Sequence, residues 1–154
     1  MAVIILWRVI VSVMNTVTYR QPSAADAESI FQLLSKLYHD DAGDGLQDML
    51  AQFLGDQSYF TLVACRQDGK LAGFLAGTTR LEPDFECRAG LIDQLYVEKD
   101  AREQGAVKAM VDQFSVWCRE RGCKGVLVPA GREGLYEPLG FEKSLVRRYW
   151  KELA

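Results

Sequence analysis

One stretch of the chain, residues 91–118, restricts the possible folds more than any other. Its first part, Leu91–Val97, has the apolar pattern of a buried strand, and a charged turn, Glu98–Ala101, follows it. A short glycine-containing loop, Arg102–Val107, then leads into a long amphipathic helix. Such a loop points several backbone N–H groups at one place, and the helix dipole adds partial positive charge there. The stretch therefore predicts a binding site for a phosphate group.

Length and composition exclude several classes of protein. A chain of 154 residues fits one domain with a real core, and 49% apolar with 25% charged residues is typical of a globular protein. The net charge of -3 gives no reason to expect nucleic-acid or anionic-membrane binding. The single histidine, His39, and four cysteines without a C-x-x-C pair argue against a zinc site or a disulfide framework. Free thiols in a reducing, cytoplasmic compartment are the expected state.

The first fourteen residues form a segment of their own. Met1–Met14 is strongly apolar, but it is too short to span a membrane, and Arg8 interrupts it. The charge lies inside the apolar run, whereas a secretory signal would carry it in front. Either the natural chain begins at Met14, or the segment is an apolar arm at a subunit contact of a homodimer. We therefore expect an extension over residues 1–14 and one domain over residues 15–154.

The rest of the pattern alternates between helices and strands. Apolar residues at helical spacing predict helices at Ala24–Tyr38, with Ser23 as N-cap, and at Leu46–Leu54. Asp68 and Gly69 indicate a hairpin turn. The other expected elements are strands Thr16–Arg20, Tyr59–Cys65, Leu71–Thr79, Cys87–Val97, Lys124–Val128 and Phe141–Trp150, the helix Glu103–Arg121, and a short helix or turn at Arg132–Leu139. This order predicts a single α+β domain with a mixed, mostly antiparallel sheet flanked by helices.

Two motifs carry a family resemblance. Leu95-Tyr96-Val97 followed by Arg102-Glu103-Gln104-Gly105-Ala106-Val107 resembles the R/Q-x-x-G-x-G/A signature of the GNAT superfamily of N-acetyltransferases. The segment Leu135–Phe141 resembles the Tyr…Gly-Phe segment near the end of that fold. The resemblance implies acetyl-CoA as co-substrate, a GNAT-like fold, and these nine residues, Leu95–Val97 and Arg102–Val107, as its binding segment. The pantetheine arm carries amides, which can pair with an exposed edge at Leu95 and Val97.

The binding loop also departs from the family pattern. Val107 stands at the last motif position, where the family keeps Gly or Ala, and a β-branched side chain there is expected to fill space beside the phosphates. On this interpretation Val107→Gly would not weaken CoA binding. Glu103 adds a negative charge that would repel a pyrophosphate unless its side chain points outward.

Two residues are candidates for the chemistry of acetyl transfer, which needs a neutral amine and a proton for the departing thiolate. Asp93 is the candidate base or amine anchor, and alternation along the strand would place it on one face with Leu91, Leu95 and Val97. Tyr136 is the candidate general acid. The alternatives are a strand aspartate paired with an arginine, and an ordinary core tyrosine.

The acceptor is expected to be a primary amine of a small cationic molecule or a peptide. Two acidic loops would attract it, although each could simply be solvated surface: His39, Asp40, Asp41 and Asp44, and Glu82, Asp84 and Glu86. No cysteine occupies a recognisable nucleophile position, so the amine is expected to attack directly within a ternary complex. Two alternatives remain: a degenerate GNAT fold that binds CoA without catalysis, and an interaction module.

Overall fold

The computed structural model describes residues 16–38, 43–129, 134–143 and 151. The apolar arm at residues 1–14, most of the acidic loop at residues 39–42 and most of the expected last strand lie outside these ranges. Within the described ranges, no helix is long and apolar enough to cross a membrane.

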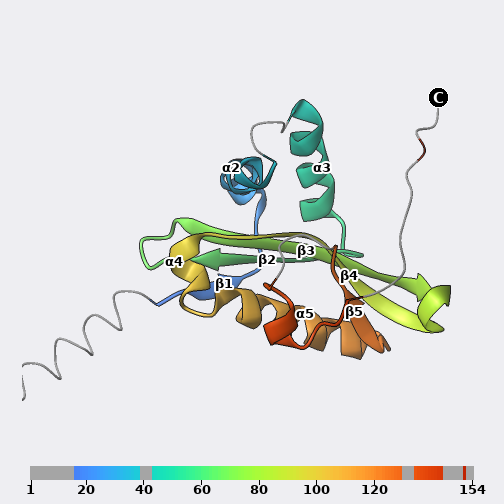
Figure 1. The fold of residues 1–154 in the computed structure, drawn as a ribbon. Coiled ribbons are helices and arrows are strands. Elements are labelled where there is room, and N and C mark those ends of the chain that lie inside the picture. The colour runs from blue at the N-terminus through green and yellow to red at the C-terminus, as the bar shows by residue number, and fades with distance from the viewer. Residues whose placement is uncertain (1–15, 39–42, 130–133, 144–150, 152–154) are drawn as a thin grey trace, which may run out of the picture.

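A five-stranded sheet forms the centre of the molecule, with its strands in the order of the sequence (Figure 1). The strands are β1 (Thr18–Arg20), β2 (Phe60–Cys65), β3 (Leu71–Glu82), β4 (Cys87–Val97) and β5 (Gly125–Leu127). Neighbours are antiparallel from β1 to β4, and only β4 and β5 run parallel. The predicted mixed, mostly antiparallel sheet is therefore confirmed.

Helices cover both faces of this sheet, which gives the molecule two cores (Figure 1). On one face lie α2 (Ala27–Leu37), which follows the short helix η1 (Ala24–Asp26), and α3 (Asp44–Gly55). Ser23 forms a capping box with Asp26 at the start of η1, as its position before the helix predicted. On the other face lies α5 (Ala106–Glu120), preceded by the single turn α4 (Lys99–Arg102). The short helices η2 (Pro83–Phe85) and η3 (Glu137–Leu139) complete the described elements.

A glycine in β4 allows α5 to approach the sheet closely. A Cβ atom added at Gly90 would lie 2.3 Å from Sγ of Cys118 and 3.2 Å from the ring of Phe114. Both of these α5 side chains are fully buried in the core on this face. Gly90 therefore faces α5, and any side chain there would push the helix away.

A bulge in β4 corrects the predicted face of Asp93. Ile92 pairs with Gly77 of β3 and Gln94 pairs with Ala76, so Asp93 is one extra residue without its own partner on β3. Ile92 lies in the core on the α5 side, and alternation places Asp93 on the opposite face. Leu95 and Val97, beyond the bulge, return to the α5 side. Asp93 therefore shares a face with Leu91, as expected, but not with Leu95 and Val97, because the bulge interrupts the alternation between Asp93 and Leu95.

The helix after β4 begins later than predicted. The expected helix Glu103–Arg121 is interrupted at Gly105, whose φ of +78° belongs to the left-handed region, and α5 starts at Ala106. The charged turn before it contains the short helix α4. The predicted hairpin turn is confirmed, with Gly69 at a φ of +83°.

Candidate active site

In the part of the chain that the structure describes, no strand pairs with the second half of the β4 edge that faces β5. Among the described residues, β5 pairs with β4 only from Ala89 to Leu91. The N–H of Glu98 donates to the carbonyl of Ala72 on β3 at 2.7 Å. Alternation therefore turns the N–H and C=O groups of Leu95 and Val97 away from β3, toward the open edge. An amide-bearing ligand can pair with this edge as an added strand would.

Tyr96, between these two residues, is turned the other way. It pairs with Phe74 of β3, and its ring packs against the core under α2 and α3. Burial raises the pKa of its phenol, and the nearby Glu98 carboxylate adds to that rise. The structure therefore brings Leu95 and Val97 to the open edge, but not Tyr96.

The backbone donors for a phosphate lie at the start of α5 rather than along the whole loop. The N–H groups of Arg102 to Gly105 already donate to carbonyls within the turn, at 2.9 to 3.1 Å. The first intrahelical bond of α5 runs from the N–H of Ala109 to the carbonyl of Gly105, at 3.1 Å. The N–H groups of Ala106, Val107 and Lys108 therefore have no acceptor within the helix. The N-cap residue is Gly105, and no side chain makes a capping hydrogen bond there.

Two further observations support an anion site at this helix start. A Cβ atom added at Gly105 would meet nothing within 4 Å, so the space above the loop is open. Nε of Arg102 is buried without a hydrogen-bond partner, which makes it an unused donor beside the loop. Open space, free backbone donors and a guanidinium together match the requirements of a pyrophosphate.

The side chain of Val107 points in a different direction from the one that the motif suggested. Its side chain is only 8% exposed and packs in the core with Ala106 and Met110. The expectation that it fills space beside the phosphates was therefore wrong, because the helix turns this position toward the sheet. The Glu103 side chain is 66% exposed and lies 3.9 Å from Nζ of Lys99, so its charge points into solvent.

Asp93 is exposed at the bulge on the α2 side of the sheet. Desolvation by the surrounding protein raises the pKa of its carboxyl above the ordinary value, and the positive charge of Arg80 partly opposes this. Arg80 also donates from Nε to Glu82. Next to Asp93, Oε1 of Gln94 accepts a 2.7 Å hydrogen bond from the hydroxyl of Tyr38, at the end of α2. No local pattern in the chain predicts this contact, because the two residues are 56 positions apart.

Tyr136 lies half-buried immediately before η3. Its ring meets that of Phe141 edge to face, with ring centroids 5.6 Å apart. Burial raises the pKa of the phenol, so it is fully protonated at neutral pH and has a proton to give. The motif that suggested Tyr136 is thus a compact turn, in which the backbone carbonyl of Tyr136 accepts from the N–H of Leu139 at 2.9 Å.

Glu82 is not available to an acceptor, contrary to its expected place in an acidic loop. It is 4% exposed and accepts a hydrogen bond from Arg80 on the same strand. Asp84 and Glu86 are exposed around η2. Of the other acidic loop, the structure describes only the backbone of Asp44, as the first residue of α3.

Comparisons with known proteins agree with this geometry. The model of the acetyltransferase (GNAT) family matches residues 27–141, three-quarters of the chain. The chain belongs to the GNAT acetyltransferase family. It is 31% identical over 112 residues to aminoglycoside N(6')-acetyltransferase type 1 of Stenotrophomonas maltophilia, a match that covers 70% of this chain and 71% of that protein. The protein is therefore an acyltransferase, and acetyl-CoA is its acetyl donor.

Solved structures with the same fold include further acetyltransferases. Aminoglycoside 6'-N-acetyltransferase AAC(6')-Ih from Acinetobacter baumannii superposes with a TM-score of 0.76 at 15% identity, over 90% of this chain and 99% of that one. AAC(6')-Iy in complex with a CoA-based bisubstrate analogue superposes with a TM-score of 0.75 at 18% identity, again over 90% and 99% of the two chains. At these identities the likeness establishes the fold of this acetyltransferase.

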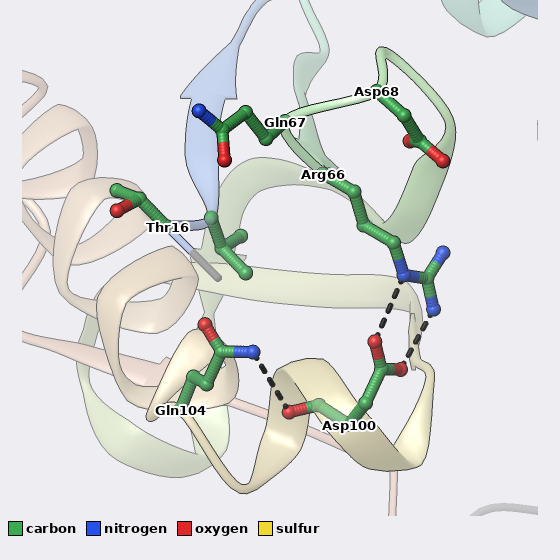
Figure 2. Close-up of a pocket in the computed structure, with 7 residues that line it drawn as sticks. Thr16, Arg66, Gln67, Asp68, Asp100 and Gln104 are labelled. Atoms are coloured by element: carbon green, nitrogen blue, oxygen red, sulfur yellow. Dashed lines mark hydrogen bonds and ion pairs between the residues drawn. The ribbon is translucent and has the colours of Figure 1, made fainter. Parts of the chain in front are cut away.

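The acetyltransferase also has a cavity of about 460 Å³ beside the β2–β3 turn and α4 (Figure 2). It is lined by Thr16 and Val17, by the β2–β3 turn at Arg66–Asp68, and by Asp100 and Gln104. Neither Asp93, Tyr136 nor the open edge of β4 contributes to it. The cavity borders the turn that leads into α5, through Asp100 and Gln104.

Proposed function

We propose that this acetyltransferase moves the acetyl group of acetyl-CoA to a primary amine of a small cationic acceptor of the aminoglycoside kind. The open edge of β4 beside the start of α5 carries the proposal, because it offers backbone donors and acceptors next to an anion site. The choice of acceptor is supported by the 31% identity to a relative named aminoglycoside N(6')-acetyltransferase.

In this proposal the donor's pyrophosphate lies against the first N–H groups of α5 and Arg102, over Gly105. Leu95 and Val97 pair with its pantetheine amides and hold the thioester at the end of the open edge. The thioester supplies an activated acetyl group. The chain's own residues then bind the amine, orient it, and hand a proton to the departing thiolate.

In the proposal, Asp93 and Tyr136 carry out the two proton transfers of the reaction. Asp93 attracts the cationic acceptor and, directly or through water, takes the proton that the amine must lose before it attacks. Tyr136 keeps its proton at neutral pH and delivers it to the sulfur. Burial raises the pKa of Cys118 to about 12 and also encloses Cys65, which disfavours an acyl-enzyme at either thiol; direct attack by the amine is the proposed route. The four free thiols agree with a reducing, cytoplasmic location, which stays a prediction, as does a homodimer.

Release of free CoA thiol tests the proposal. The purified protein and acetyl-CoA are mixed with one acceptor at a time. The acceptors are aminoglycosides that have a 6' primary amine, aminoglycosides that lack it, a polyamine and a short peptide. We expect turnover with the 6' amines, and one added acetyl group in the product by mass spectrometry. Turnover with the peptide alone would overturn the acceptor class. Binding of acetyl-CoA without turnover of any amine would favour a non-catalytic CoA-binding protein.

The variant Asp93→Asn tests the amine anchor. We expect kcat/KM for the amine to fall by about tenfold, the usual cost of losing a charged hydrogen-bond partner, with the acetyl-CoA Kd unchanged. Asp93 anchors a cation only when ionised, so activity of the wild type is lost as the pH falls through its raised pKa. The variant should lack that step, which in the wild type lies above the ordinary carboxyl pKa of about 3.9.

The same variant has a second, independent readout. A raised pKa means that the folded state disfavours the ionised carboxylate, so Asp93 costs stability at neutral pH. Asp93→Asn should therefore raise Tm at pH 7, and the difference should vanish below the unfolded-state pKa of about 3.9. A lower Tm at pH 7 together with unchanged activity would show that Asp93 is a structural strand residue.

A further inference from the structure

We propose that Arg66 is a positioning residue for acetyl-CoA binding, because it fixes α4 and thereby the start of α5. This inference rests on the proposed placement of the pyrophosphate over Gly105. Arg66 lies on the β2–β3 turn, outside both motifs of the family pattern. Its partner is Asp100, within the single helical turn that precedes the cofactor loop.

Arg66 is itself held rigidly by the hairpin. Its N–H donates to the carbonyl of Lys70 at 2.8 Å, and its carbonyl accepts from the N–H of Gly69 at 2.9 Å. Its side chain crosses to the returning strand, where Nη1 donates to the carbonyl of Leu71 at 3.0 Å. The guanidinium therefore extends from an anchored base.

The remaining donors of Arg66 meet Asp100 in a two-pronged ion pair. Nε donates to Oδ2 at 2.8 Å, and Nη2 donates to Oδ1 at 2.7 Å (Figure 2). The pairing lowers the pKa of Asp100 and raises that of Arg66, mainly through these hydrogen bonds. Nε2 of Gln104 in turn donates to the backbone carbonyl of Asp100 at 3.4 Å, so the loop is tied to the same residue. Such bidentate geometry fixes orientation as well as distance.

The helix α4 needs such support because it has only four residues, too few to hold its own position. Its other contacts include the buried Ala101 and, at Glu98, a backbone bond to β3 and an ion pair with Lys36 of α2. From α4 the chain reaches α5 through two tight turn bonds, Gln104 N–H to Ala101 at 3.1 Å and Gly105 N–H to Arg102 at 3.0 Å. A shift of α4 therefore moves the free N–H groups of α5 directly.

The test is CoA affinity measured by calorimetry on Arg66→Met and Asp100→Asn. We expect each variant to raise the Kd for CoA by about fivefold, the upper range for a partly exposed ion pair. The double variant should be no weaker than either single variant, because the two side chains act as one unit. The kcat at saturating acetyl-CoA should stay within about twofold, since the reacting groups are untouched. Arg66→Asp combined with Asp100→Arg should recover part of the affinity.

A matched control comes from a second two-pronged pair, Arg20 with Asp26, at 2.7 and 2.9 Å, which joins β1 to the turn before α2. Arg20→Met removes the same chemistry from a pair that includes no residue of α4, and should lower Tm while leaving the Kd for CoA unchanged. Equal Kd in the wild type and in Arg66→Met would overturn the proposal, as would equal weakening by Arg20→Met. A wild type that binds no CoA would instead refute the proposed site itself.

Discussion

Replacing Tyr136 with phenylalanine should lower kcat by about 100-fold, the lower range for loss of a positioned general acid. The hydroxyl is the only group removed, and the ring can keep its contact with Phe141, 5.6 Å away. The phenol's raised pKa keeps its proton in place across neutral pH, so the loss should be nearly independent of pH there. Initial rates at saturating acetyl-CoA and amine measure it.

Binding measurements separate this role from a structural one. The Kd for CoA and Tm should both stay close to those of the wild type in Tyr136→Phe. Normal turnover with weakened CoA binding would mean that the hydroxyl holds the cofactor and does not serve the reaction. A large fall in Tm would identify Tyr136 as an ordinary core tyrosine.

Replacing Val107 with glycine should lower the free energy of unfolding by about 2–3 kcal/mol. The change removes a buried side chain, and it places a glycine inside a helix. Val107 is 8% exposed in the core beside Ala106 and Met110. For a chain of this size, Tm should fall by about 5–10 °C. The motif alone suggested that this change would leave CoA binding intact or tighten it. The packing predicts instead a less ordered helix start and weaker binding.

Another valine of α5 provides the control. Val116 is 50% exposed, so Val116→Gly carries the backbone cost of glycine with little loss of packing, and should cost less than about 1 kcal/mol. Thermal unfolding measures the loss of stability in both variants. Equal losses in Val107→Gly and Val116→Gly would refute the core role of Val107. Val107→Ala should fall between the wild type and Val107→Gly.

Most of the fold could be predicted from the chain, because helical spacing and turn residues are local signals. The bounds of β4, Cys87–Val97, agree with the prediction, and α2 and α3 differ from it by a few residues at their ends. The break between α4 and α5 was missed, because a glycine in a loop motif does not reveal its φ of +78°.

The site was harder to predict, because its geometry depends on partners distant in the sequence. The bulge at Asp93 exists only relative to β3, so alternation along one strand wrongly grouped the residue with Leu95 and Val97. The motif gave Val107 a position but not a direction, which the fold of α5 against the sheet decides. The pair of Arg66 and Asp100 joins residues 34 positions apart, and no local pattern indicates it.

The bulge has one more consequence, for insertions and deletions in this strand. Ile92 and Gln94 pair with adjacent residues of β3, so a chain lacking Asp93 would form an uninterrupted ladder in which every core residue keeps its present face. Loss of a residue from either regular half of β4 would instead move the side chains of part of the strand to the opposite face of the sheet. The proposed amine anchor is thus an insertion that the sheet itself does not need, and this family member could lose it without losing its fold.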